Sequence, residues 1–416
     1  MPGLNILLSA YACEPGKGSE PGVGWHWARE LARLGHRVWV ITRANNQPLI
    51  EAELQRWPQP DLQFAYYDLP RWARWWKKGG RGIRLYYTLW QWGAYRRAKT
   101  MARDVQFDRV HHITFGGFHL PSFMMLLNKP FTFGPVGGGE RAPRALRQSF
   151  PWKRRLLEGV RDAANAAVAV HPVSRAVFQR SDLILCKTRE TEARIPAKYR
   201  HKCRVQLEIG TESASAPVPR AEDRNLRQLR VLYMGRLIYW KGLHLALRAF
   251  AEARKALPEA RMTVIGSGPD EKWLHGIAAG LKLGCAIEWM HWLPQEKALQ
   301  AYSQHDVLLF PSLHESSGNV VLESLARGLP VVCLDLGGPG VIVSRDCGRA
   351  VSTAQRSEAD VVSGLAGALV ELASPEEWQR ASCGALARAR DYRWENIVGS
   401  CYAGVPQTIL AGGNKA

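Results

Sequence analysis

Two acidic side chains at a fixed spacing are the residues best suited to chemistry in this sequence. Glu315 and Glu323 lie in the segment 310–323, Phe-Pro-Ser-Leu-His-Glu-Ser-Ser-Gly-Asn-Val-Val-Leu-Glu, which predicts a strand end, a loop and a helix beginning at Gly318 and Asn319. Amides at a helix start favour an anionic ligand, and carboxylates accept hydrogen bonds from hydroxyl groups. The segment therefore favours a ligand with phosphate and polyol parts, such as a nucleotide sugar. A solvated helix start with an ordinary surface glutamate is the alternative.

Two cations follow another predicted strand end. In the segment 233–242, Tyr-Met-Gly-Arg-Leu-Ile-Tyr-Trp-Lys-Gly, Gly235 ends the strand and leaves Arg236 and Lys241 on the next loop and helix start. A guanidinium fork and a compact ammonium suit phosphate oxygens, so the two could neutralise a departing diphosphate without a metal. Taken singly, each residue is as well explained as a surface cation, but the acidic segment strengthens the functional interpretation.

Weaker patterns mark other turns. Gly266 and Gly268, before Pro269, allow close backbone approach to a ligand, although a tight turn alone explains them equally well. In the first half, a glycine-rich loop at 14–24 lacks the spacing of a phosphate loop or a dinucleotide fingerprint. We expect a small set of weak acceptor-side candidates on this loop and after two later strands: Gly22, Gly24, His112, Thr114, His119 and Gly137. Packing roles are the alternative for the histidines, and a mobile connection for the glycines around Gly137.

Elements that would position these residues alternate along the chain. Short apolar runs and amphipathic segments predict parallel strands at 5–10, 37–42, 62–67, 109–114, 131–133, 182–186 and 204–207, and again at 229–234, 262–265, 287–290, 307–310 and 331–334. The prediction is an α/β protein with two Rossmann-like domains, and parallel sheets of this kind bind ligands at the carboxyl ends of their strands. We expect the domains at 1–210 and 229–392, joined by a linker at 211–228, with a C-terminal helix at 393–416 packing back on the first domain. The expected site is a cleft between the domains.

Positive charge is concentrated in the first half. Of 56 basic and 37 acidic residues, residues 1–200 hold 32 and 15, a formal charge of +17 within a total of +19. The segment Arg71–Arg103 carries ten basic side chains without an acid, interleaved with Trp and Tyr. This mixture suits the headgroup region of an anionic membrane. Buried aromatics beneath a solvated charged face, or stacking on single-stranded nucleic acid, are the alternatives, but no nucleic-acid motif accompanies the segment.

Cysteine usage and the N-terminus indicate the compartment. The eight cysteines are scattered without a Cys-x-x-Cys pair, and no signal peptide or membrane-spanning run is evident. We expect reduced thiols in the cytoplasm, with any membrane contact peripheral, on the cytoplasmic face of the inner membrane.

The chain resembles a family-4 retaining glycosyltransferase (group 1 glycosyl transferase) of the GT-B fold, from the branch in bacterial polysaccharide or glycolipid biosynthesis. The resemblance rests on Gly-Arg-Leu-x-x-x-Lys-Gly at 235–242, Gly-x-Gly-Pro at 266–269, and the Glu-x7-Glu segment at 315–323, followed by Ala-Arg-Gly-Leu-Pro-Val-Val. The Gly-Pro-Val-Gly-Gly run at 134–138 is similar to one branch of bacterial members. The chain departs from the family at Ser317, usually Phe, and at Ser324, often Ala.

The resemblance implies roles for single residues. Arg236 and Lys241 would hold the donor diphosphate, Glu315 would contact the transferred sugar, and Glu323 would bind the ribose. Further donor-side positions would be Gly235, Gly266, Gly268, Trp292, Leu293, Ser317, Gly318, Asn319 and Val320. The family needs no metal and no cofactor beyond the nucleotide sugar, and this chain has no Asp-x-Asp motif.

The predicted activity is transfer of a sugar from a nucleotide-diphosphate donor to a hydroxyl of a glycan or lipid-linked glycan, with retention of anomeric configuration. A nucleotide-sugar epimerase or phosphorylase of the same fold is one alternative. A non-catalytic, membrane-associated sugar-binding assembly subunit is another. The variable loops do not specify the base, the sugar or the linkage.

Overall fold

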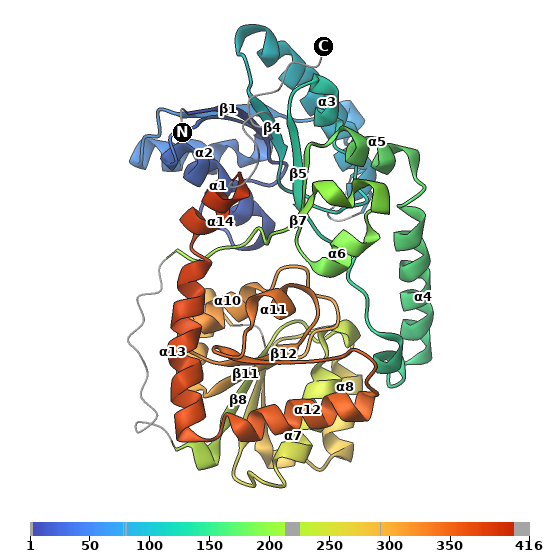
Figure 1. The fold of residues 1–416 in the computed structure, drawn as a ribbon, viewed down its shortest axis with the longest axis vertical. Helices are drawn as coiled ribbons and strands as arrows, with labels where there is room; N and C mark the ends of the chain where they lie inside the picture. The colour runs from blue at the N-terminus through green and yellow to red at the C-terminus, as the bar shows by residue number, and fades with distance from the viewer. Residues whose placement is uncertain (1–2, 78, 80, 213–224, 292, 403–416) are drawn as a thin grey trace. The chain divides into compact units, whose positions relative to one another are not determined.

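The computed structural model describes residues 3–77, 79, 81–212, 225–291 and 293–402, and these divide into two compact units (Figure 1). The first unit comprises residues 1–139, 163–209 and 394–416, and the second comprises residues 140–162 and 210–393. Residues 140–162 therefore belong with the C-terminal half of the sequence. Most of the predicted linker, residues 213–224, lies outside the described residues.

The first unit is built on a parallel sheet of seven strands in the order β3-β2-β1-β4-β5-β6-β7. Its apolar strands are buried by helices, as parallel sheets require. The strands are β1 (Asn5–Ser9), β2 (Arg37–Arg43), β3 (Leu62–Tyr67), β4 (Arg109–His112), β5 (Phe131–Val136), β6 (Leu183–Cys186) and β7 (Cys203–Val205).

Helices of the first unit follow the predicted alternation. They are α1 (Ser19–Arg33), α2 (Gln47–Arg56), α3 (Ile83–Asp104), α5 (Pro172–Arg180), α6 (Arg189–Arg194) and α14 (Trp394–Cys401). The C-terminal α14 packs on α1, where the rings of Trp394 and His26 stack with centroids 4.4 Å apart. The rest of the predicted C-terminal helix, residues 403–416, lies outside the described residues.

The second unit holds a parallel sheet of six strands in the order β10-β9-β8-β11-β12-β13. Its strands are β8 (Arg230–Met234), β9 (Arg261–Ile265), β10 (Ile287–Met290), β11 (Val307–Phe310), β12 (Val331–Leu334) and β13 (Gly348–Val351). Five of these strands were predicted from their apolar runs. The edge strand β13 was not, because Gly-Arg-Ala-Val does not read as an apolar run.

Helices of the second unit connect and cover these strands. They are α7 (Leu243–Ala253), α8 (Glu271–Gly280), α9 (Gln295–Gln304), α10 (Asn319–Leu325), α11 (Gly337–Ile342), α12 (Glu358–Glu371) and α13 (Pro375–Asp391). The longer helix α4 (Trp152–Ala167) begins in the second unit and ends in the first (Figure 1). Two parallel α/β sheets confirm the predicted fold class.

The strand order decides which loops meet. Because β8 and β11 are neighbours in a parallel sheet, the loops after their carboxyl ends emerge side by side. These two loops carry Arg236 and Lys241 on one side and Glu315 on the other. No helix among the described residues is long and apolar enough to cross a bilayer.

Candidate functional site

Lys241 and Glu315 form an ion pair through Nζ and Oε2, joining the loops after β8 and β11. Their side chains are 20% and 18% exposed, so the pair is partly open to solvent. The two motifs that the sequence predicts to act together are thus in direct contact, although 74 residues separate them. The Lys241 ammonium also lies 5.6 Å from the centroid of the Phe310 ring, at the end of β11.

Gly242 makes this junction possible. Its φ is +74°, and a Cβ there would lie 1.8 Å from the carbonyl oxygen of Pro311. Only glycine accommodates both the left-handed conformation and this close approach. The hydroxyl of Tyr233 donates to the Lys241 carbonyl at 3.1 Å, which fixes the turn from beneath.

Arg236 is exposed, and its guanidinium makes no hydrogen bond or ion pair with another described residue. It follows Gly235 directly at the carboxyl end of β8, on the same loop as Lys241. Beside this loop, a Cβ at Gly266 would lie 1.9 Å from the Gly235 carbonyl oxygen, and one at Gly268 would lie 2.3 Å from that of Leu237. The two turns are therefore packed backbone to backbone. The exposed Arg236 side chain, which has no partner among the described residues, is a cation available to a ligand.

Glu323 lies on α10 and is partly buried. Burial raises the pKa of its carboxyl group, while a 2.8 Å hydrogen bond from the Tyr302 hydroxyl and the charge of Arg327 act in the opposite direction. Tyr302 comes from α9 and was not singled out from the sequence, since nothing in its surroundings marks it. One carboxylate of the predicted pair thus has a protein partner on an adjacent helix.

The start of α10 contains the remaining donor-side positions. Gly318 precedes the helix with φ +98°, and Ser317, Asn319 and Val320 are partly exposed around it. Leu293 is partly buried after β10, and Trp292 lies outside the described residues. Those of these positions that the structure describes therefore lie on or next to the loops that follow β10 and β11.

A second glycine-rich turn, missed in the sequence, supports the Glu315 loop. The amide of Gly338 donates to the Glu315 carbonyl at 2.8 Å, and a Cβ at Gly337 would lie 2.1 Å from that oxygen. The signal was the Gly-Gly-Pro-Gly run that begins at Gly337, separated from the end of β12 by two residues. It holds the backbone of the loop in place while the Glu315 carboxylate points to Lys241.

Residues 140–162 supply a further support that the sequence did not reveal. Glu158 on α4 is completely buried and accepts hydrogen bonds from His314 Nε2 at 2.7 Å and from the Tyr239 hydroxyl at 2.9 Å. Burial raises the pKa of Glu158, but the hydrogen bonds from His314 and Tyr239, together with nearby positive charge that includes Arg161, hold the pKa below its usual value. The neighbouring Ser316 donates to Glu140 at 2.9 Å. The residues on either side of Glu315 are thus both tied to this segment.

The acceptor-side candidates lie in the first unit, and several of them have structural partners. Thr114 accepts a hydrogen bond from the amide of Ala12 at 2.9 Å. His112 is 1% exposed, and burial lowers its pKa to about 3, so its ring is neutral. His119 is partly exposed, and Gly137 forms a parallel bridge with Gly117.

Gly22 and Gly24 lie in the first turns of α1, packed against the preceding loop. A Cβ at these positions would lie 2.0 Å and 2.1 Å from the carbonyl oxygens of Lys17 and Ala12. Both glycines therefore have a packing role in this loop.

The segment Arg71–Arg103 divides into core and surface. Tyr86, Tyr87 and Trp90 are buried, whereas Trp72 and Trp75 are more than three-quarters exposed. On α3, a hollow of about 440 Å³ is lined by Trp92, Tyr95, Arg96, Lys99, Thr100 and Arg103. Part of the aromatic set is thus in the core, as one of the alternatives predicts, and the rest is on the surface. Lys78 lies outside the described residues.

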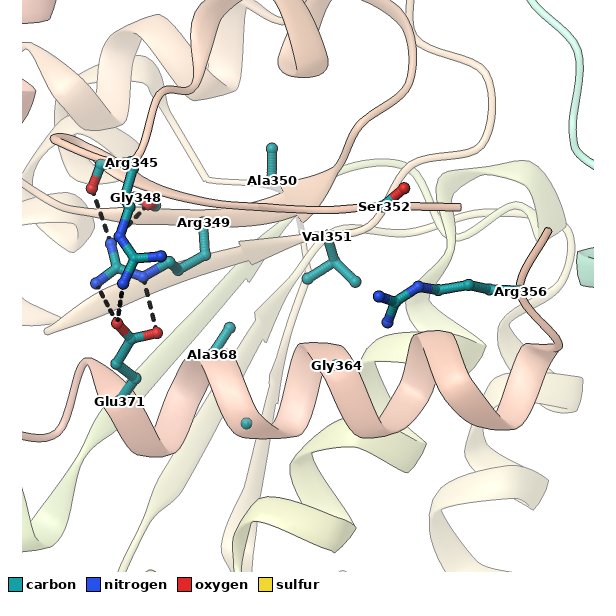
Figure 2. Close-up of a pocket in the computed structure, with 11 residues that line it drawn as sticks. Arg345, Gly348, Arg349, Ala350, Val351, Ser352, Arg356, Gly364, Ala368 and Glu371 are labelled. Atoms are coloured by element: carbon teal, nitrogen blue, oxygen red, sulfur yellow. Dashed lines mark hydrogen bonds and ion pairs between the residues drawn. The ribbon is translucent and has the colours of Figure 1, made fainter. Parts of the chain in front are cut away.

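Another hollow, of about 440 Å³, lies between β13 and α12 (Figure 2). Figure 2 shows the Arg349 guanidinium facing the Glu371 carboxylate. The guanidinium donates to Glu371 at 2.9 and 2.8 Å and to Glu377 at 2.6 Å. These ion pairs raise the pKa of Arg349 and tie the edge strand to α12 and α13. Because Glu371 and Glu377 already neutralise the buried Arg349, we interpret this hollow as a structural feature and not as a binding site.

Comparison with known proteins gives a family and a fold. Residues 218–380 match the family model described as "Glycosyl transferases group 1". The glycogen synthase of Mycobacterium tuberculosis is 30% identical over 169 residues, 40% of either chain. The D-inositol 3-phosphate glycosyltransferase of Corynebacterium urealyticum is 29% identical over 254 residues, 53% of this chain and 56% of that protein. The matched regions thus span about 40% and 56% of these two relatives.

Solved structures extend the likeness over nearly the whole chain. The crystal structure of Anabaena Alr3699/HepE in complex with UDP and glucose superimposes with a TM-score of 0.56 at 15% identity, covering 95% of this chain and 98% of that chain. WaaG, a glycosyltransferase involved in lipopolysaccharide biosynthesis, gives a TM-score of 0.56 at 16% identity, covering 98% and 100%. Residues 218–380 thus match the group 1 glycosyltransferase family that the sequence resembles, and the chain has the GT-B fold.

Proposed function

We propose that this protein transfers a sugar from a nucleoside-diphosphate donor to a hydroxyl of a glycan or lipid-linked glycan, with retention at the anomeric carbon. The observation that carries the proposal is the Lys241–Glu315 ion pair, on the same strand-end loops as the unpartnered Arg236. A cation pair and a carboxylate in this arrangement suit the diphosphate and the hydroxyls of one ligand.

In the proposed reaction, the bond between the anomeric carbon and the diphosphate oxygen breaks, and a bond to the acceptor oxygen forms on the same face. Arg236 and Lys241 stabilise the negative charge that develops on the leaving diphosphate, the kind of electrostatic contribution that is usually largest in catalysis. The acceptor proton passes to the leaving phosphate. Glu315, held by Lys241, accepts hydrogen bonds from the sugar, and Glu323 accepts them from the ribose.

Uridine diphosphate sugars are the first donors to test, because Alr3699/HepE is named as a complex with UDP and glucose. The proposed setting is synthesis of a bacterial surface polysaccharide or glycolipid, for which WaaG, named for lipopolysaccharide biosynthesis, is the supporting likeness. The proposed location is the cytoplasmic face of the inner membrane.

Thermal shift with a panel of nucleotide sugars, followed by transfer of a labelled sugar to lipid-linked glycan, tests the proposal. A donor should raise the melting temperature of the wild type and leave that of Lys241→Ala nearly unchanged, because ligands stabilise only the state that binds them. Lys255→Ala, an exposed lysine on the same unit, is the matched control. Label that changes only within the donor pool would favour an epimerase, and release of a sugar phosphate would favour a phosphorylase.

A non-catalytic assembly subunit makes the opposite prediction. Its biological role would survive Glu315→Ala and Lys241→Ala, whereas a transferase loses its role with either substitution. Complementation of a deletion strain with the two variants distinguishes the two functions.

The proposed membrane contact of the first unit uses the surface of Arg71–Arg103. Arg96, Lys99 and Arg103 are exposed next to Trp92 on α3, so anionic headgroups would find both charge and an interfacial ring. Replacing the three cations with alanine should weaken flotation with anionic vesicles at low salt. Equal binding to neutral and anionic vesicles would contradict this part of the proposal.

A further inference from the structure

Helix α4 packs with its polar side inward. Glu158 is buried, Asp162 is 21% exposed and pairs with Arg147 at 2.9 Å, and Arg154 reaches Asp270 at 2.7 Å. A surface helix of a globular protein normally turns its apolar stripe to the core and its charges to water. In its first three turns, α4 has the reverse arrangement.

The outward side of the same turns is apolar. Trp152, Leu156 and Val160 are 66%, 65% and 60% exposed and lie at successive spacings of four residues, which places them on one face of the helix. Leu157 beside them is 47% exposed. Single exposed apolar residues are ordinary, but a continuous stripe marks a surface that binds something.

The charged side chains of residues 140–162 are also divided between the two sides of the segment, with carboxylates on the inner side and cations on the outer side. All three carboxylates face inward, since Glu140 is 3% exposed, Glu158 is buried and Asp162 is paired. The exposed charges are those of Arg144, Lys153 and Arg155, and the Lys153 ammonium lies 5.5 Å from the Trp152 ring centroid. The apolar stripe is therefore flanked only by cations.

We propose that the outer face of α4 docks in the headgroup region of an anionic lipid bilayer, with Trp152, Leu156 and Val160 inserted between the headgroups. An amphipathic helix with cationic flanks and a tryptophan on its apolar face has the features of an interfacial helix. A second copy of the chain fits less well, because symmetric pairing would bring Lys153 and Arg155 against their own counterparts without a carboxylate on that face.

Polar contacts on the inner side fix this surface to the second unit. Besides Glu158 and Arg154, Ser149 just before the helix donates to Glu358 on α12 at 2.9 Å. The proposed contact thus goes beyond the α3 surface, which belongs to the first unit, and it requires neither sugar transfer nor any charge of the segment Arg71–Arg103.

Vesicle flotation of the full chain tests the docking. The vesicles contain phosphatidylglycerol and phosphatidylcholine in equal parts, with pure phosphatidylcholine for comparison. Leu156→Glu combined with Val160→Glu should lower the partition coefficient on anionic vesicles at least about tenfold, because two inserted side chains are lost and the added charges are repelled. Leu49→Glu with Val370→Glu, two exposed apolar positions on other helices, is the matched control and should bind like the wild type.

A second variant separates insertion from charge repulsion. Leu156→Ala with Val160→Ala adds no charge and should still reduce partitioning by several-fold. Wild-type binding by this variant would overturn insertion, as would a wild type that shows no preference for anionic vesicles. Loss of a concentration-dependent dimer in the glutamate variant, without a change in flotation, would assign the face to a second copy instead.

The flotation result can be interpreted independently of the proposed sugar transfer. Because neither substituted side chain contacts the donor-side loops, both α4 variants should keep the donor-induced rise in melting temperature. Failure of flotation with an intact donor response would overturn the docking alone. Repeating the comparison in the Arg96, Lys99 and Arg103 alanine background shows whether α4 contributes independently of α3.

Discussion

His314 Nε2 lies 2.7 Å from the carboxylate of Glu158, and His314 is the residue immediately before Glu315. This buried hydrogen bond connects α4 to the loop that carries the proposed sugar-binding carboxylate. Because Ser316 on the other side of Glu315 is bound to Glu140, the loop is held from both flanks by one segment. We infer that Glu158 positions Glu315 without touching the substrate.

Glu158→Gln should destabilise the protein and lower transfer. The amide retains the shape of the side chain but loses a charge-assisted hydrogen bond in a buried site, at a cost of about 1–3 kcal/mol in the free energy of unfolding. Because the folded pKa of Glu158 is below its usual value of 4.5, its contribution is present above that pH and is lost as the pH falls through the folded pKa. Urea unfolding curves of wild type and variant should therefore converge in acid.

Exposed Glu259 provides the matched control, and Glu259→Gln should leave both stability and transfer unchanged. An unaltered KM for the donor together with unaltered kcat in Glu158→Gln would argue against a positioning role.

Arg236→Ala and Lys241→Ala should each lower kcat/KM by about 10²–10³, as expected for the loss of a group that stabilises transition-state charge. Their effects on stability should differ. Arg236 is exposed and unpartnered, so its removal should change the free energy of unfolding by less than about 0.5 kcal/mol, whereas Lys241→Ala leaves Glu315 without its partner. Steady-state kinetics and denaturant melts on the same preparations check both statements, and full activity of either variant would rule out the proposed role of that residue.

Gly242→Ala should destabilise the protein by about 2–4 kcal/mol. The added Cβ would have to occupy a left-handed conformation and would collide with the Pro311 carbonyl. Gly280→Ala, at the end of α8 with open space around the added atom, should be neutral or stabilising by up to about 1 kcal/mol. Differential scanning calorimetry measures both, and equal melting temperatures for the two variants would contradict the close approach.

Buried histidines should make the protein sensitive to acid. Burial lowers the pKa of His244 from 6.5 to about 3. Between these two pH values the histidine is protonated in the unfolded chain and neutral in the folded chain. Stability is then lost at about 1.4 kcal/mol per pH unit for this one group. The ring nitrogens of His244 have no hydrogen-bond partner among the described groups, so His244→Phe should retain or improve stability. The variant should also take up about one proton fewer on unfolding in acid, which makes the fall of stability with pH less steep.

The same substitution at exposed His201 is the control and should leave the free energy of unfolding at neutral pH close to that of the wild type. An unchanged slope in His244→Phe would show that the histidine is already protonated in the folded state.

Much of the fold and the centre of the site could be predicted from the sequence, because local signals determined them. Apolar runs bounded by turns predicted the strands, and parallel neighbours at β8 and β11 bring Lys241 and Glu315 together wherever the intervening chain goes. The edge strand β13 was not predicted, because its Arg349 can be buried only when Glu371 and Glu377, from later helices, neutralise it.

Glu158 was not identified from the sequence for a related reason. It hydrogen-bonds a residue 156 positions away, and it lies on the polar side of a helix, which sequence reasoning assigns to solvent. Only tertiary structure shows that this side is buried.

Residues 140–162 have a consequence for how the protein can be dissected. The chain passes from one unit to the other at 139–140, 162–163, 209–210 and 393–394, so no single cut yields one intact unit. A fragment limited to the family-model region, residues 218–380, would lack Glu158 and leave the Tyr239 hydroxyl and the His314 ring without their acceptor. Two pieces made by division at residues 211–228 would each hold parts of both units, and neither unit could be rebuilt unless the pieces reassociated.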